Sequence, residues 1–194
     1  MTAQSPERII LDGRPRELYA QPLYRLIKHF RIDLGCPDYY STDNYRGYIG
    51  TWEIRDRHLR LVQLSWNGQE EIPMPDGIAA RVFRAAGCTG FPVNAHWFTG
   101  SIRIPIGRQL VYSHQGWSHW FERERIIHFR SGEITRDREV NTHAMLERWL
   151  RQYEPASDRF APSRSNSLGP LIWFDDAEDS TTDWWPPGYP QSPE

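Results

Sequence analysis

The stretch from Tyr45 to Leu64 constrains the fold most, because it alternates apolar and polar residues over two short runs. Residues 48–54 and 59–64 both carry large apolar side chains at mostly every second position, which is typical of half-buried strands. A tight turn at Asp56-Arg57 separates the two runs. The pattern predicts an antiparallel hairpin, and much of the later chain repeats it.

Further strands are predicted on the same grounds. Turn dipeptides at Asp12-Gly13 and Ser131-Gly132 each lie between two strand-like runs, which favours two more hairpins. Pro105 is expected to end the strand that precedes it. The expected strands cover residues 8–11, 16–19, 93–98 (beginning after Pro92), 102–104, 109–113, 117–130 and 133–140. Residues 1–7 are polar and are expected to fray.

One long helix is predicted near the end of the folded region, over residues 142–153. Asn141 or Thr142 can cap it, and its apolar residues recur at helical spacing. A shorter helix is expected over residues 77–86, whereas residues 23–32 fit either a helix or an extended segment. The sequence therefore predicts an α+β fold: a predominantly antiparallel, strongly twisted or partly closed sheet with a C-terminal helix packed on it.

The composition changes after the long helix, which divides the chain of 194 residues into three parts. Residues 1–155 are predicted to form a single β-rich domain. Residues 156–170 are rich in Ser and Pro and read as a linker. Residues 171–194 hold six acidic residues and no Lys or Arg, so a whole-chain net charge of −2 leaves +4 for the rest. This acidic tail is expected to dock on its own domain or on a partner.

The chain is rich in large rings, with nine Trp among its aromatic residues. Rings of this kind fill the core of a small β-rich fold, and they also supply much of the energy of protein interfaces. Four rings in the acidic tail are candidate partner-binding residues: Trp173, Phe174, Trp184 and Trp185.

Three phrases resemble a family of small uncharacterised bacterial proteins. They are YRGYIGTWE at residues 45–53, WFTGSIRIPIG at residues 97–107 and LVYSHQG at residues 110–116. The resemblance covers roughly residues 8–140 and implies a bacterial source and a cytoplasmic location, with no established activity and no site residues. The chain departs from the family at His96, where an acidic residue is expected before Trp97.

A second, shorter resemblance is to the calycin barrels, whose first strand carries a Gly-x-Trp motif similar to Gly50-Thr51-Trp52. It implies a closed barrel around a ligand cavity. Candidate ligand-binding residues are then Trp52, His96 and Trp97.

Candidate catalytic residues are confined to one cluster of titratable side chains: His114, His119 and Glu122. Histidine and glutamate can exchange protons near neutral pH, which general acid–base catalysis requires. On a regular strand, however, His119 and Glu122 point to opposite faces. The simpler expectation is that these histidines lie half-exposed on the sheet surface.

No motif predicts a cofactor or a metal. The chain lacks the glycine-rich phosphate loops, the nucleophile elbow and the paired His or Cys spacings of zinc sites. Cys36 and Cys88 stand alone, as expected for structural thiols in a reducing compartment. No membrane-spanning run is present in the sequence, so a cytoplasmic location is expected.

Nucleic acid is a disfavoured partner. Arginines among residues 103–138 alternate with acidic residues, so cross-strand ion pairs are expected to cancel their field. The sequence therefore favours a non-enzymatic intracellular protein-interaction module, similar to bacterial immunity or accessory proteins, with another protein as partner. The alternative is a calycin-like small-molecule-binding barrel or a small hydrolase with a His/Glu site.

Overall fold

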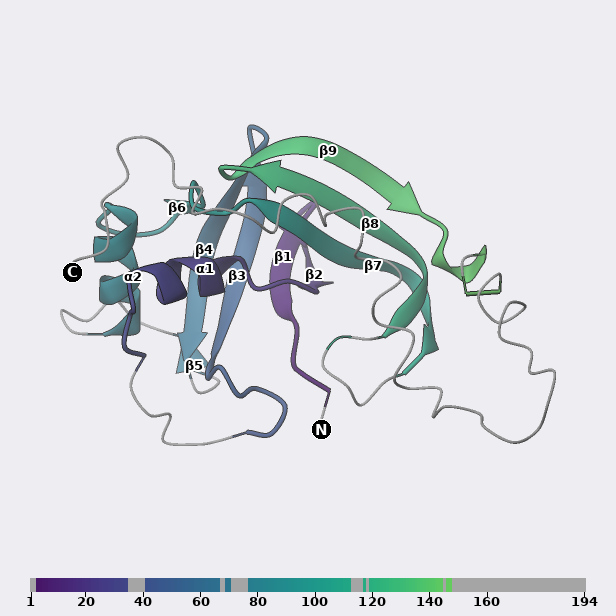
Figure 1. The fold of residues 1–194 in the computed structure, drawn as a ribbon, viewed down its shortest axis with the longest axis horizontal. Coiled ribbons are helices and arrows are strands. Elements are labelled where there is room, and N and C mark those ends of the chain that lie inside the picture. The colour runs from purple at the N-terminus through teal and green to yellow at the C-terminus, as the bar shows by residue number, and fades with distance from the viewer. Residues whose placement is uncertain are drawn as a thin grey trace.

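The computed structural model describes residues 3–34, 41–66, 69–70, 77–112, 117, 119–144 and 146–147. These residues form a twisted, mainly antiparallel sheet with two helices, an α+β fold as the sequence predicts (Figure 1). The strands are β1 (Glu7–Leu11), β2 (Arg14–Leu18), β3 (Tyr48–Arg55), β4 (His58–Trp66), β5 (Gln69–Glu70), β6 (Val93–Asn94), β7 (Gly100–Val111), β8 (Trp120–Arg130) and β9 (Glu133–Val140). The helices are α1 (Pro22–His29) and α2 (Ile78–Ala86).

The three predicted two-residue turns are confirmed, and each joins an antiparallel pair. They lie between β1 and β2, β3 and β4, and β8 and β9. Both residues of each turn have positive φ: Asp12 and Gly13, Asp56 and Arg57, Ser131 and Gly132. Positive φ at both positions matches the right-handed twist of the flanking strands, so these turns set the register of the hairpins.

The strands follow the order β2-β1-β3-β4-β9-β8-β7, with β5 and β6 also paired to β4. Most neighbours are antiparallel, but β1 pairs with β3 in parallel, which makes the sheet mixed. Between β4 and β9 the register contains a single pair, His58 with Glu133. The sheet therefore has two halves, β2-β1-β3-β4 and β9-β8-β7, which can curve independently. Figure 1 shows the second half as a long arm, coloured teal to green.

The two outer strands of this order meet at one point. The backbone N–H of Tyr19, just after β2, donates to the carbonyl oxygen of Arg103 in β7 at 2.9 Å, as an isolated antiparallel bridge. The sheet thus curls back on itself but stays open, because no ladder of hydrogen bonds extends from this bridge in the described residues.

The main core lies between the two halves of the sheet and the two helices. Trp52 and Leu61 from the first half, Ile102 and Ile127 from the second, and Leu26 of α1 are all completely buried. Apolar residues at helical spacing make α1 a helix where the sequence left the choice open. Helix α2 begins one residue after the predicted start and ends at Gly87, whose φ of 68° closes it in the left-handed conformation.

Two strand predictions are wrong. The strand expected over residues 93–98 begins after Pro92 as predicted, but β6 ends at Asn94, because the chain then turns and the Phe98 N–H donates to the Ala95 carbonyl. Pro105 does not end a strand either, since β7 continues through it to Val111. Residues 109–111 of the separate strand expected over 109–113 therefore belong to β7. A proline fits an edge strand when its missing N–H faces away from the neighbouring strand.

The long C-terminal helix is confirmed over its described start. Residues 142–144 and 146–147 are helical, and the Asn141 side-chain oxygen accepts from the Ala144 N–H at 3.1 Å, as an N-cap does. Leu146 is buried against Trp120, so the helix packs on β8. The rest of this helix, the linker and the acidic tail with its four candidate rings lie outside the described residues. Of the described helices, none has the length and apolar character to cross a membrane.

The outer strands carry features that oppose pairing with another chain. Strand β2 presents Arg14, Pro15 and Arg16 as exposed residues. Strand β7 contains Pro105 and two register shifts near Gln109. Charges, prolines and bulges on edge strands are the usual protection against edge-to-edge association.

Two turn glycines provide a matched test of how closely the turn between β8 and β9 packs against the loop at Ala95. Gly13 and Gly132 both have positive φ, but a Cβ at Gly13 meets nothing within 4 Å, whereas one at Gly132 would lie 2.6 Å from the Ala95 carbonyl oxygen. We expect Gly13→Ala to lower the free energy of unfolding by about 1–2 kcal/mol, the backbone cost alone. Gly132→Ala should cost about 3 kcal/mol or more, because the turn must also leave the Ala95 loop. Equal losses in urea unfolding would contradict this packing.

Candidate functional site

Trp117 joins two buried places where an arginine lies beside a glutamate, Arg46 with Glu7 and Arg103 with Glu124, at one end of the sheet. Its indole N–H donates to the Gln4 carbonyl at 2.9 Å, and its own carbonyl accepts from Arg103 at 3.3 Å. Its ring lies 5.6 Å from the guanidinium carbon of Arg46 and 6.4 Å from the ring of Tyr19. We call the residues around it the Trp117 cluster, which has two parts: the Glu7 group (Glu7, Arg46, Tyr48 and Trp52) and the Arg103 group (Tyr19, Arg103, Tyr112, His119 and Glu124).

The Glu7 group forms where β1 runs parallel to β3. Alternation along β3 places Tyr48, Gly50 and Trp52 on one face, toward the start of β1. The indole N–H of Trp52 donates to a carboxyl oxygen of Glu7, and both side chains are completely buried. A Cβ at Gly50 would lie 2.8 Å from each of the two bonded atoms. The Gly-x-Trp motif is therefore explained by a close approach that admits only glycine.

The charge of the Glu7 group is unusual. Burial raises the pKa of the Glu7 carboxyl to about 8, against the opposing effects of the Arg46 charge and the Trp52 hydrogen bond. The other carboxyl oxygen of Glu7 lies 4.0 Å from Arg46 Nε and has no hydrogen bond. Glu7 is consequently a largely protonated acid at neutral pH, inside a β-rich core.

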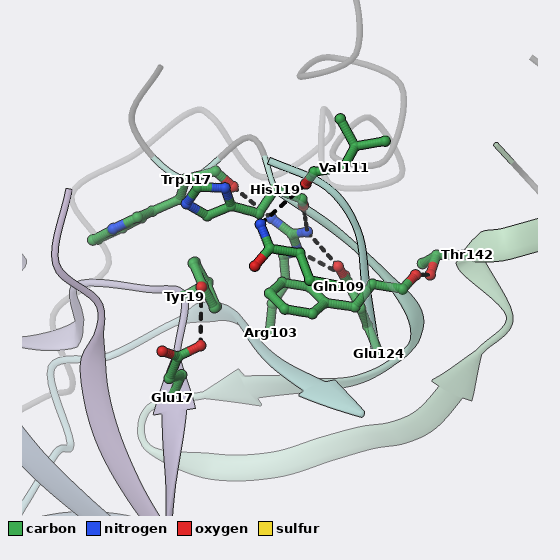
Figure 2. A network of polar contacts seen from close by, with 10 residues as sticks. Glu17, Tyr19, Arg103, Gln109, Val111, Trp117, His119, Glu124 and Thr142 are labelled. Carbon is green, nitrogen blue, oxygen red and sulfur yellow. Dashed lines mark hydrogen bonds and ion pairs between the residues drawn. The ribbon is translucent and has the colours of Figure 1, made fainter. Parts of the chain in front are cut away.

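The Arg103 group contains a buried ion pair between Arg103 and Glu124, drawn in Figure 2. Arg103 donates to both carboxyl oxygens of Glu124, at 2.7 Å from Nε and 2.5 Å from Nη2. It also donates at 3.3 Å to the carbonyls of Trp117 and His119. This two-pronged pair spans β7 and β8 and fixes the chain that leads into β8.

Rings cover the Arg103 pair. Tyr19 lies edge-on to His119 at 5.8 Å between centroids, and Arg103 lies 5.9 Å from the Tyr19 ring. Tyr112 stacks on His119 at 5.0 Å and is 59% exposed. Burial and the carboxylate of Glu17, which accepts the Tyr19 hydroxyl at 3.0 Å, raise the pKa of Tyr19, so this hydroxyl stays protonated. The rings of Tyr19, His119 and Tyr112 therefore extend from the buried Arg103–Glu124 pair to the surface.

The structure separates the predicted ligand-binding residues. Trp52 and Trp97 are buried core residues, and the Trp97 indole N–H donates to the Pro22 carbonyl at 2.8 Å. His96 is exposed and lies in the turn after β6, apart from the two buried tryptophans. His119, by contrast, is buried beneath Tyr112, so the expectation that it lies half-exposed is wrong. It sits in the segment before β8 rather than on the strand, and the strand alternation does not apply to it.

The predicted catalytic residues are not brought into one described arrangement. The Glu122 carboxylate binds Arg108, at 3.0 Å from the backbone nitrogen and 3.1 Å from the guanidinium, and these contacts lower the pKa of Glu122. His119 contacts Tyr19 and Tyr112 instead. His114 lies outside the described residues, as does Cys36.

The arginines of β8 make the cross-strand pairs expected of them. Arg123 binds Glu139 at 2.6 Å and Arg125 binds Asp137 at 2.7 Å. The Arg125–Asp137 contact lowers the pKa of Asp137 and raises that of Arg125, although burial opposes both shifts. Across the described part of the chain, no three His, Cys, Asp or Glu side chains gather as a metal ion would require. Burial raises the pKa of the half-buried Cys88 thiol, which disfavours the reactive thiolate.

Sequence reasoning missed most of the Trp117 cluster. The polar residues 1–7 predict a frayed segment, but Glu7 begins β1, and the Ser5 hydroxyl before it donates to the Asp43 carboxylate at 2.7 Å. Arg103 was read as a surface arginine, yet Ile102, Arg103 and Ile104 are all buried. A charged residue between two isoleucines, with an acidic residue on the next strand, is the signal that could have found the second pair.

Comparison with protein-family models, with curated proteins and with solved structures finds no match for the chain. The resemblance to an uncharacterised bacterial family therefore stays a prediction.

The raised pKa of Glu7 gives a testable pH dependence. Between the unfolded value of 4.5 and the folded value of about 8, the folded protein holds a proton that the unfolded chain releases. Stability is therefore lost as the pH rises through this window. Glu7→Gln mimics the protonated acid, so its stability relative to wild type should grow with pH, by at most about 1.4 kcal/mol per pH unit. Urea unfolding between about pH 5 and pH 9 measures this difference.

Glu133→Gln is the control, because it replaces a carboxylate at the surface that is 57% exposed. Its pH profile should run parallel to that of wild type. A profile for Glu7→Gln that also runs parallel to wild type would show that Glu7 is ionised in the folded protein throughout this range.

Proposed function

We propose that the protein is a binding module for another protein. Its contact surface would be the exposed rim of the Trp117 cluster, by which we mean the side chains of Trp117, Tyr112 and the neighbouring Tyr45. The observation that supports this most is the partly exposed Trp117 ring, which lies 5.6 Å from the Arg46 guanidinium carbon and edge-on to Tyr19. Two exposed tyrosines are linked to it: Tyr112 stacks on His119, and the backbone N–H of Tyr45 donates to Gln4, whose carbonyl accepts the Trp117 indole N–H. Trp, Tyr and Arg are the residues that dominate binding energy at protein interfaces.

Rigidity favours this use of the rim. Tyr112 is stacked on a buried histidine, and Trp117 is anchored by hydrogen bonds at both its indole and its carbonyl. Rings already held in place lose little conformational entropy when a partner binds. The tyrosine hydroxyls can also form hydrogen bonds at an interface whose centre is apolar.

The partner would bind through side chains rather than by adding a strand. The edges of β2 and β7 carry charges, prolines and bulges, which oppose strand addition. Arg103 is already paired with Glu124 and buried, so the rim selects by shape and apolar contact more than by charge. We therefore propose a partner protein that presents apolar side chains flanked by hydrogen-bond acceptors. An immunity or accessory protein inside a bacterial cell would use its surface in this way.

A second candidate function is small-molecule binding beside Trp52. A closed calycin barrel would need a continuous ladder between the outer strands, and β2 and β7 share one bridge. The observation in favour of a ligand is different: buried polar atoms next to Trp52 have no hydrogen-bond partner.

Site-specific photo-crosslinking in the native cell tests the main proposal. A photoreactive phenylalanine analogue at Tyr112 or Tyr45 should give one shared protein adduct, because Tyr112 stacks on His119, two residues after Trp117, and the Tyr45 N–H donates to Gln4, which also accepts the Trp117 indole N–H. The same analogue at Arg136, exposed on β9, is the control and should not give that adduct. The adduct protein, once purified, should bind wild type saturably, and Tyr112→Ala should weaken the affinity roughly tenfold, as loss of an interface tyrosine does.

The proposal would be overturned by equal crosslinking at Arg136. It would also be overturned by unchanged affinity in Tyr112→Ala and Tyr45→Ala together.

A further inference from the structure

The Glu7 group contains more hydrogen-bond donors than its neighbours satisfy. Arg46 Nη2 donates to the Ser5 carbonyl at 2.8 Å, but its Nε and Nη1 have no hydrogen-bond partner although both atoms are buried. The hydroxyl of Tyr48 and one carboxyl oxygen of Glu7 are also buried and have no hydrogen-bond partner. Such groups rarely remain unpaired in proteins, because a buried polar atom that has lost its hydrogen bonds to water destabilises the folded state.

These unpaired atoms belong to side chains that adjoin one another. The guanidinium carbon of Arg46 lies 5.5 Å from the Tyr48 ring, and its Nε lies 4.0 Å from Glu7. Glu7 is near enough to Tyr48 for its charge to raise the pKa of the hydroxyl, in the same direction as burial. The protonated Tyr48 hydroxyl and the guanidinium are donors, so the shortage at this place is of an acceptor.

The charge balance points the same way. The Arg46 guanidinium keeps its positive charge at any physiological pH, and its side chain is only 8% exposed. Glu7 is its nearest described carboxyl, at a distance too long for a hydrogen bond. Asp43 feels the Arg46 charge, which helps to lower the pKa of Asp43, but its carboxylate is bonded to the hydroxyls of Ser5 and Ser41.

We propose that the Glu7 group is a binding site for a small oxyanion, a carboxylate or a phosphate. Its oxygens would accept hydrogen bonds from Arg46 and from the Tyr48 hydroxyl, and the neutral Glu7 carboxyl would add its own O–H as a donor. The Trp117 ring lies 5.6 Å from the guanidinium carbon, within the range of a cation–π contact that favours the charged arginine. The competing occupant is water, which can also satisfy buried polar atoms.

Thermal unfolding in different anions tests the site. Sodium acetate and inorganic phosphate are compared with sodium chloride at matched ionic strength and about pH 7, where a ligand of the folded state raises Tm in a saturable way. At least one of the two oxyanions should do so beyond the effect of chloride, and which one does identifies the class. Tyr48→Phe keeps the ring and removes the donor, so it should raise the apparent Kd roughly tenfold.

Arg108→Met is the control for anions at the surface, since Arg108 is 79% exposed. It should respond to the oxyanion as wild type does. Equal Tm values in all three salts would overturn the proposal, as would a Tyr48→Phe response equal to that of wild type. Either result would assign the unpaired atoms to water.

The pH dependence gives an independent readout. The groups that act on Glu7 are Arg46 and Trp52, and the other titratable groups that the described residues place around the site are Tyr24, Asp43 and Tyr48. At about pH 9 the ionised Glu7 would itself neutralise Arg46 and repel the anion, so wild type should lose its response. Glu7→Gln cannot ionise and should keep it. Loss of the response in both proteins would contradict the role assigned to Glu7.

Discussion

A buried carboxyl, that of Glu7, is the constraint from which the rest of this end of the molecule follows. It accepts the indole N–H of Trp52 across the parallel pairing of β1 with β3, and Gly50 makes room for the contact. The parallel pairing brings the chain before β1 against the loop that precedes β3, where Ser5 bonds Asp43 and Arg46. A polar terminus is thereby folded into the body of the protein.

The second buried pair solves a related problem at the open side of the sheet. Strands β2 and β7 share only the bridge at Tyr19 and Arg103, and the side chain of Arg103 reaches across to Glu124 and to the carbonyl of Trp117. Arg103 thus bridges the two outer strands through its backbone. Its side chain fixes the segment that precedes β8. Trp117 also contacts Arg46, so a change in the position of Arg46 or of Arg103 can shift the Trp117 ring.

The hairpins could be read from the sequence because their signals are local. Period-two runs and turn dipeptides such as Asp12-Gly13 act within a few residues, and the capped start of the last helix is equally local. Glu7 could not be read in this way, since its burial depends on Trp52 in a strand 45 positions later in the chain. Pro105 was misread for a similar reason: whether a proline ends a strand depends on which side has a neighbour. The candidate site consists of such long-range contacts, so little of it could be predicted.

The central claim is that a neutral acid beside a charged guanidinium leaves this buried group short of an acceptor. A carbon-13 NMR titration of the Glu7 side-chain carboxyl, assigned by comparison with Glu7→Gln, tests it directly. We expect a titration midpoint near 8, because burial opposes ionisation more strongly than Arg46 and Trp52 favour it. A midpoint at or below the ordinary value of 4.5 would show an ionised Glu7 that neutralises Arg46 itself, and would contradict the account.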